Sequence, residues 1–220
     1  MSYQRLYSCQ KEPGTVSWVT SNLSESGVFY DIGANTGAYS LIGGSRLNAY
    51  GKVYAFEPVP STFIELCQNV QLNKLEEKVI PINVALSDSN SVVPFGLNSF
   101  SGGVAMHMGL SDTEILANSD ETVFNYLIRT QTLDSLVKEF NLLPPTIIKI
   151  DVDGPEFKVL KGASNVLKSE KLLSLQIEMD ELNQPIKEMT SFLEDHGLIF
   201  KDKYQHGNSE IFDYVFERKV

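Results

Sequence analysis

One stretch decides the fold of this 220-residue chain, Val28-Phe-Tyr-Asp-Ile-Gly-Ala-Asn-Thr-Gly37. Its apolar first half predicts a short buried strand that ends at Asp31 and Ile32. Gly33 and Gly37 then let the backbone turn and approach a ligand closely before a helix begins. The G-x-x-x-G spacing matches neither the G-x-G-x-x-G of a dinucleotide site nor the G-K-[ST] ending of a nucleoside-triphosphate loop. We therefore expect a ligand site at this turn, with a plain strand-to-helix connection as the alternative.

An acidic residue closes the next predicted strand, in the segment Val53-Tyr-Ala-Phe-Glu57-Pro58. Glu57 follows Gly37 by 20 positions (57 − 37). A doubly wound α/β fold places there the carboxylate that accepts hydrogen bonds from ribose hydroxyls. We therefore predict that Glu57 binds ribose, and a solvated carboxylate at a strand end is the alternative.

Strands and helices alternate along the rest of the chain, which is typical of an α/β domain with a largely parallel sheet. Further strands are predicted at Lys52–Phe56, Val79–Ala85, Thr146–Asp151 and Leu172–Glu178, and helices around Trp18, at Thr36–Leu47, Ser61–Leu72 and Thr132–Phe140, through Val159 and Leu167, and at Ile186–Leu193. The last two predicted strands, Leu198–Tyr204 and Ile211–Glu217, have no helix between them, so they should be antiparallel.

Composition limits the classes of protein to consider. The 18 basic and 28 acidic residues give a formal charge of −10, and 42% of the residues are hydrophobic. The apolar content and the length fit one folded domain, or two small ones, rather than a disordered chain. The negative charge argues against a nucleic-acid partner, which would need clustered Lys and Arg, and it suits a small neutral or cationic partner.

The cysteine content and the start of the chain bear on location. Cys9 and Cys67 are the only cysteines, so we expect neither a disulfide framework nor a cysteine metal cluster. The sequence has no apolar run of about 18 residues, so we expect no membrane-spanning helix. Met1–Gln10 lacks the apolar core of a signal peptide, and a reducing cytoplasm is the simplest location. No oligomeric state is predicted.

One stretch breaks the alternation of strands and helices. Residues 92–129 are rich in Gly, Ser, Asn and Met, and form a long insertion between core elements. Such an insertion is usually either functional or disordered. We expect a strand or hairpin there, together with a mobile segment that covers one end of the sheet.

Several motifs follow one another in a recognisable order. They are the glycine turn, the Glu57 strand end, Ile82-Asn-Val-Ala-Leu-Ser-Asp88, Thr132-Leu-Asp-Ser-Leu136, Ile148-Lys-Ile-Asp-Val-Asp-Gly-Pro-Glu156 and Val159-Leu-Lys-Gly162. Together, from about Tyr30 to Glu178, they resemble the FkbM family of S-adenosylmethionine-dependent methyltransferases. The resemblance implies a single-domain class I methyltransferase with a Rossmann-like α/β fold. Its seven-stranded sheet would be mostly parallel, with an antiparallel last strand and helices on both faces.

The resemblance also implies S-adenosyl-L-methionine as the cofactor. It implies that Asp31, Gly33 and Asn35 bind the methionine part, with Gly37 completing the turn. Glu57 would bind the ribose, Ala85 would contact the adenine, and Asp151 would lie beside the sulfonium. Because this cofactor carries a net positive charge, a cleft lined by carboxylates suits it.

The implied reaction is methylation of a hydroxyl on a sugar or another small polyhydroxylated or natural-product acceptor. A hydroxyl acceptor needs a base to take its proton as the new bond forms. The catalytic candidates are Asp151, Glu178 and His107, with Asp153 and Glu156 as further carboxylates. We expect a helical lead-in at residues 1–27 and a methyltransferase domain at 28–220, whose insertion at about 96–129 binds the acceptor.

Two carboxylates raise the question of a metal ion. Asp151 and Glu178 end two strands that should be neighbours, and the related catechol O-methyltransferase has acidic Mg²⁺ ligands at similar strand ends. We predict no metal ligand here and keep a divalent ion as the alternative. Lys149 lies two residues before Asp151, on the same face of the strand, and is expected to pair with it. The chain departs from the family pattern at Asp153, where Glu is usual, and at Pro155, where a small residue is common.

Two other classes of function are alternatives. One is a cofactor-binding module that binds S-adenosylmethionine and transfers no methyl group. The other is an NAD-dependent oxidoreductase, which would share the architecture but needs a different glycine spacing. Cofactor binding and turnover separate these two classes from a methyltransferase.

Overall fold

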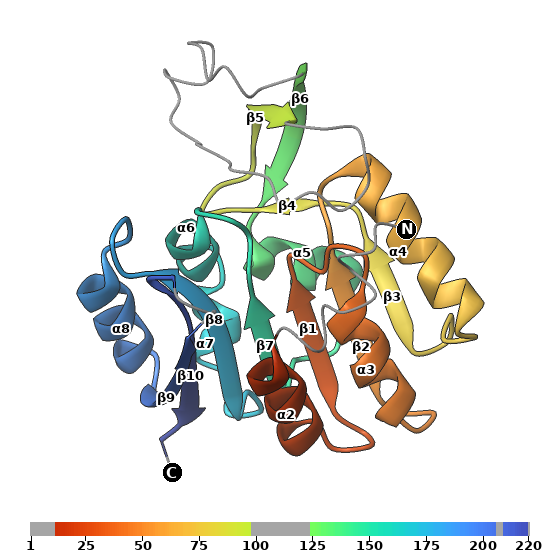
Figure 1. Ribbon diagram of the computed structural model, residues 1–220, viewed down its shortest axis with the longest axis horizontal. Helices are drawn as coiled ribbons and strands as arrows, with labels where there is room; N and C mark the ends of the chain where they lie inside the picture. Colours follow the sequence, from red (N-terminus) through yellow and green to blue (C-terminus); the bar gives the residue numbers. More distant parts are fainter. Residues whose placement is uncertain (1–11, 98–123, 206–208, 220) are drawn as a thin grey trace.

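The computed structural model describes residues 12–97, 124–205 and 209–219 (Figure 1). The strands of its main sheet are β1 (Val28–Ile32), β2 (Lys52–Phe56), β3 (Val79–Ile82), β7 (Ile147–Ile150), β8 (Ser174–Asp180), β9 (Leu198–Gln205) and β10 (Ile211–Arg218). These seven strands lie in the order β3-β2-β1-β7-β8-β10-β9. The first five are parallel, and β10 pairs antiparallel with both β8 and β9. The predicted sheet, with its antiparallel last strand, is confirmed.

Helices cover both faces of this sheet. They are α2 (Pro13–Asn22), α3 (Ala38–Arg46), α4 (Pro60–Leu72), α5 (Leu133–Phe140), α6 (Glu156–Lys161), α7 (Ser164–Leu167) and α8 (Ile186–Asp195). Neighbouring side chains of β1 point to opposite layers. Phe29 packs in one core cluster with residues of α2, α3 and α4, whereas Tyr30 packs in the other with residues of α5 to α8. Within the described ranges, no helix is both long and apolar enough to cross a bilayer.

A second, small sheet lies beyond the carboxyl ends of the parallel strands, at the top of Figure 1. Its strands are β4 (Ala85–Leu86), β5 (Ser91–Leu97) and β6 (Phe124–Gln131), in the order β4-β6-β5. Strands β5 and β6 are antiparallel, so the hairpin expected within residues 92–129 is present. The residues between them, 98–123, lie outside the described part of the chain.

The structure divides the strand that the sequence predicts at Val79–Ala85. The chain leaves the main sheet after β3, and β4 pairs with β6 in the small sheet. Asn83 causes the break, because its side-chain amide donates to the carbonyl oxygens of Glu57, at 2.7 Å, and Pro58, at 3.0 Å. These bonds tie the segment after β3 to the end of β2 and turn it toward the cleft.

The helix expected around Trp18 is α2, and buried polar contacts anchor it to the sheet. The Thr15 hydroxyl donates to Asp213 of β10 at 3.0 Å and accepts from Gln176 of β8 at 2.7 Å. The Trp18 indole donates to the hydroxyl of Ser174 at 2.9 Å. Since buried polar groups must be satisfied, these contacts fix the helix against β8 and β10.

Candidate active site

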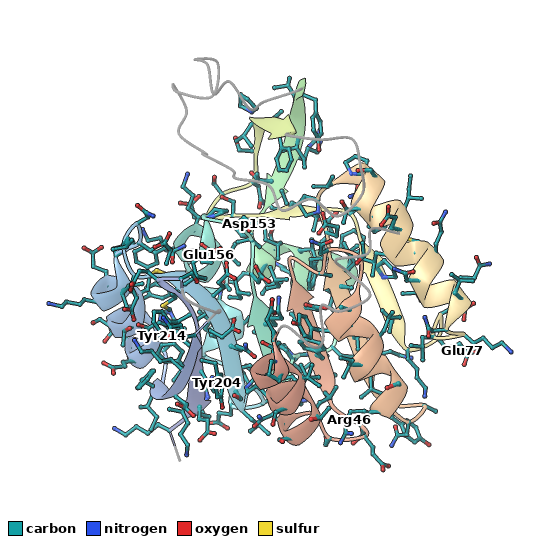
Figure 2. The ribbon with its side chains drawn as sticks, viewed as in Figure 1. Arg46, Glu77, Asp153, Glu156, Tyr204 and Tyr214 are labelled. Atoms are coloured by element: carbon teal, nitrogen blue, oxygen red, sulfur yellow. The ribbon has the colours of Figure 1, made fainter. Side chains whose placement is uncertain are left out.

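The carboxyl ends of the parallel strands border a cavity of about 250 Å³. A second cavity of about 120 Å³ shares Gly33, Asn35 and Asp151 with it. Figure 2 shows Asp153 and Glu156 at this end of the sheet, on the side of the small sheet. Ligands of open α/β sheets bind at the carboxyl ends of the strands, so this edge is the candidate site.

The glycine turn depends on backbone conformations and close contacts that only glycine allows. Gly33 has φ +77°, and a Cβ there would lie 1.7 Å from the carbonyl oxygen of Asp151. Its N–H donates to the carbonyl oxygen of Phe56 at 3.0 Å. Gly37 has φ +91° and stands directly before α3. The turn is therefore held against the ends of both β2 and β7.

Glu57 is buried and ties the turn to the end of β2. One carboxylate oxygen accepts from the N–H of Asn35 at 2.9 Å, and the other accepts from the N–H of Val59 at 2.9 Å. Glu57 also lines the larger cavity. It is thus held rigidly where the sequence places a ribose ligand, and that role stays a prediction.

Asp31 lies behind the turn and is fully buried. Its Oδ2 accepts from the hydroxyl of Ser40 at 2.5 Å, and its Oδ1 has no hydrogen-bond partner among the described residues. Burial raises the pKa of Asp31, against the opposing effects of the Lys149 ammonium and of Ser40. Asp31 therefore supports the turn from behind.

Lys149 is a buried cation at the centre of the site. Its ammonium lies 2.7 Å from Oδ2 of Asp151, which confirms the pairing predicted from their spacing. Burial by itself would lower the pKa of Lys149, but the carboxylates of Asp151 and Asp31 outweigh it and raise that pKa. The lysine is therefore charged and holds the Asp151 carboxylate in place.

Three carboxylates meet at the mouth of the larger cavity. One oxygen each of Asp151, Asp153 and Glu178 lies within 4.8 Å of the others, and all three side chains are half-buried. The expected convergence of Asp151 and Glu178 is thus observed, with Asp153 as a third member. We call these residues the acidic cluster. Carboxylates so close together repel one another, so a bound proton or cation would relieve them.

Glu156 is not placed to act as a base. It is fully buried, and its carboxylate accepts from the N–H groups of Val152 at 3.2 Å and Gly154 at 2.9 Å. The Gln184 side chain donates to its other oxygen at 2.5 Å. These bonds close the loop after β7, in which Asp153 has φ +56°. Glu156 is therefore a positioning residue for the acidic cluster.

Most of the predicted site residues line the larger cavity. They are Gly33, Asn35, Glu57, Ala85, Asp151 and Glu178. Asp31 and Gly37 are not among the residues that line either cavity, and they support the turn instead. His107 and most of the predicted acceptor-binding segment lie outside the described residues.

Several lining residues have no motif that marks them. Glu12 lines both cavities, and Phe95 of β5 forms part of the larger one, with Val59 and Thr62. The apolar pattern of β5 predicts that Phe95 is buried, but not against which neighbour. Pro13 predicts a helix start, and nothing in the sequence predicts that the preceding Glu12 reaches the cleft.

The sequence matches the family described as the methyltransferase FkbM domain over residues 31–200. Among curated proteins, hexuronic acid methyltransferase AglP of Haloferax volcanii is 29% identical over 176 residues. The aligned region covers 79% of this chain and 65% of the relative, so this chain spans less than two thirds of that protein.

Solved structures agree with the predicted fold. Methyltransferase FkbM from Methylobacillus flagellatus superposes with a TM-score of 0.59 and 19% identity, covering 88% of this chain and 44% of that one. Precorrin-6y C5,15-methyltransferase from Geobacter metallireducens gives a TM-score of 0.56 and 16% identity, covering 95% and 87%. At these identities the likeness concerns the fold alone, and it confirms a class I methyltransferase architecture.

Proposed function

The chain belongs to the FkbM methyltransferase family, and we propose that it transfers the methyl group of S-adenosylmethionine to a hydroxyl oxygen of a sugar or a similar small polyhydroxylated acceptor. The observation that carries the proposal is the meeting of the glycine turn, Glu57 and the acidic cluster around one cavity. This arrangement supplies a cofactor cleft and proton acceptors at the same strand ends.

The residues of the cleft fit a cationic nucleoside cofactor. Glu57 would bind the ribose hydroxyls, Ala85 would line the adenine, and Gly33 would allow the methionine part to pass close to the backbone. Among the described residues at this edge, carboxylates outnumber the buried Lys149, which suits a ligand with net positive charge. When bound, the cofactor supplies a methyl group already activated by its sulfonium.

The protein's own contribution to the reaction is positioning and proton transfer. The acceptor hydroxyl must meet the methyl carbon in line, and holding it there removes much of the barrier. A carboxylate of the acidic cluster would take the hydroxyl proton as the bond forms. Asp151 is held by Lys149, so we assign it to orienting the acceptor, and Glu178 or Asp153 to accepting the proton.

The curated relative and the charge of the cleft both support this class of acceptor. AglP is named for hexuronic acid, a sugar, and sugars present the hydroxyl groups that this mechanism needs. The acidic cluster would repel a second carboxylate beside the reacting hydroxyl, so a neutral sugar ring fits this part of the cleft better. We further propose that residues 96–129, around β5 and β6, bind the rest of the acceptor.

Two measurements on the full chain test the proposal. Calorimetric titration should show binding of S-adenosylhomocysteine and no binding of NAD. Transfer of a radiolabelled methyl group should then be assayed across neutral sugars, uronic acids and amines, with transfer expected first to neutral hydroxyl acceptors. Absence of S-adenosylhomocysteine binding at millimolar concentration would refute the proposal. Binding without transfer to any acceptor would instead support a module that has lost catalysis.

A further inference from the structure

Glu12 contributes a carboxylate to the cleft, although it lies outside the part of the sequence that matches the family. It precedes α2, whereas the match begins at residue 31. It lines both cavities, and the smaller cavity is otherwise bordered by the glycine turn, the start of α3, Lys149 and Asp151. Among the described residues of the lead-in segment, Glu12 is the one that reaches the site.

The fold holds Glu12 in this position. Helix α2 is anchored by the buried contacts of Thr15 and Trp18 to β8 and β10. Gly14 packs closely under the ring of Tyr204, since a Cβ on Gly14 would lie 2.9 Å from that ring. A residue between a docked helix and the cleft loses little further freedom when a ligand binds.

The carboxylate of Glu12 belongs to a charged group around Lys149. It accepts a hydrogen bond from the hydroxyl of Tyr39, and the Lys149 ammonium lies 5.1 Å from the centre of the Tyr39 ring. The carboxylates of Glu12, Asp31 and Asp151 all act on this one ammonium. Of these residues Glu12 and Asp151 line the smaller cavity with Lys149, and two carboxylates against one ammonium leave that cavity with excess negative charge, which favours a cationic ligand group there.

Under the proposed function, each cavity takes one end of the cofactor. Glu57 borders only the larger one, so the ribose and adenine belong there, and the amino-acid end belongs beyond Gly33 in the smaller one. We propose that Glu12 is a cofactor-binding residue whose carboxylate accepts a hydrogen bond from the α-ammonium of S-adenosylmethionine. This inference rests on the proposed function, and it makes the lead-in segment part of the cofactor site.

A cycle of two proteins and two ligands tests the assignment. The full-length wild type and Glu12→Gln are titrated calorimetrically with S-adenosylhomocysteine and with its analogue in which hydrogen replaces the α-amino group. A charge-assisted hydrogen bond predicts that Glu12→Gln weakens binding of S-adenosylhomocysteine by about tenfold to a hundredfold. For the analogue, the affinity of Glu12→Gln should stay within about twofold of that of the wild type, because the analogue lacks the ammonium that Glu12 would bind.

Controls separate this role from a structural one. Glu25→Gln changes an exposed glutamate beyond the far end of α2 and should leave both affinities unchanged. If Glu12→Gln does not fold, Glu12→Asp withdraws the carboxylate by one methylene and should reduce the preference for S-adenosylhomocysteine over the analogue. Equal weakening of both ligands, or of neither, would overturn the inference while the proposed function stands. A folded wild type that binds neither ligand would overturn the proposed function itself.

Discussion

The ammonium of Lys149 lies 2.7 Å from Oδ2 of Asp151, and only 2% of Lys149 is exposed. Lys149 lies in β7 and Asp151 directly follows that strand, two positions further along the chain. Side chains two positions apart share one face of a strand. Asp31 lies on the neighbouring strand, and its carboxylate also acts on this ammonium. The buried ammonium of Lys149 thus holds together the carboxylates of Asp31 and Asp151, at the ends of β1 and β7.

Replacing Lys149 with methionine should therefore destabilise the protein. Lys149→Met leaves the carboxylates of Asp31 and Asp151 without their cation, and Asp31 is fully buried. Removing one partner of a buried ion pair lowers the free energy of unfolding by about 3–5 kcal/mol, and partial exposure of Asp151 reduces this to about 2–3 kcal/mol. Urea unfolding at pH 7 measures the loss. Lys187→Met, on the exposed face of α8, is the control, and an equally small effect for both variants would contradict this role of Lys149.

A Cβ at Gly33 should disrupt the turn. Gly33→Ala combines an unfavourable φ of +77° with a contact of 1.7 Å to the carbonyl oxygen of Asp151. We expect a loss of about 3 kcal/mol or more in the free energy of unfolding and a loss of S-adenosylhomocysteine binding. Gly197→Ala is the matched control, since φ is +80° there and the nearest atom to a Cβ is a guanidinium nitrogen of Arg218, at 2.8 Å, rather than a backbone atom. It should lose about 1–2 kcal/mol and keep ligand binding. Similar behaviour of the two variants would show that φ alone matters.

Glu57 should be needed for cofactor affinity beyond its structural role. In the wild type, the Glu57 carboxylate accepts hydrogen bonds from the N–H groups of both Asn35 and Val59. In Glu57→Gln an amide NH₂, which cannot accept, faces one of these two N–H groups. Calorimetry should show an affinity for S-adenosylhomocysteine at least tenfold weaker, because an acceptor for the ribose and for the turn is lost. Glu77→Gln, which Figure 2 places far from the cleft, should bind like wild type. Unchanged affinity in Glu57→Gln would remove Glu57 from the cofactor site.

The sequence predicts the elements whose geometry depends on local backbone and pattern. Gly33 and the apolar run of β1 are examples, because the turn excludes a Cβ and the buried strand requires apolar side chains. The break after β3 is different. It depends on the side chain of Asn83 reaching carbonyl groups of Glu57 and Pro58, which are distant in the sequence. No local pattern contains that contact.

The same distinction applies to the candidate site. Strand ends meet at one edge of a parallel sheet, so the convergence of Asp151 and Glu178 follows from predicted strand order. The roles of Glu12 and Glu156 do not, since the first depends on how a helix packs and the second on the direction of a side chain. Glu12 reaches the cleft only because α2 docks on β8 and β10, and Glu156 turns back onto the amides of the preceding loop. The spacing of residues in the sequence specifies neither the angle at which a helix docks nor the direction in which a side chain points.

Removal of divalent metal should leave methyl transfer intact. The acidic cluster resembles a set of Mg²⁺ ligands, but Lys149 already occupies one oxygen of Asp151 and its positive charge opposes a second cation. Activity after dialysis against EDTA should stay within about twofold of the untreated protein, and added Mg²⁺ should not raise it. Loss of activity in EDTA that Mg²⁺ restores would identify the acidic cluster as a metal site.

Glu156 should make stability depend on pH with a defined sign. Burial raises the pKa of Glu156 above its ordinary value of 4.5, so the folded state binds this proton more tightly than the unfolded state does. Its contribution to stability is complete below pH 4.5 and is lost as the pH rises through the folded pKa. Glu156→Gln cannot titrate. The free energy of unfolding of wild type relative to this variant should therefore decrease with rising pH, by at most about 1.4 kcal/mol per unit.

Urea unfolding of both proteins between pH 5 and pH 8 measures this difference. Glu188→Gln, on the exposed face of α8, controls for general changes in charge and should track wild type at every pH. At pH 7 the glutamine keeps one oxygen for the amides of Val152 and Gly154, but it turns an amide NH₂ toward the Gln184 donor, so the loop that presents Asp153 loosens. Methyl transfer should then fall while S-adenosylhomocysteine affinity changes little, since Glu156 touches neither cavity. A stability difference that is flat or grows with pH would show that the glutamate is ionised without penalty, and the buried positioning role would be wrong.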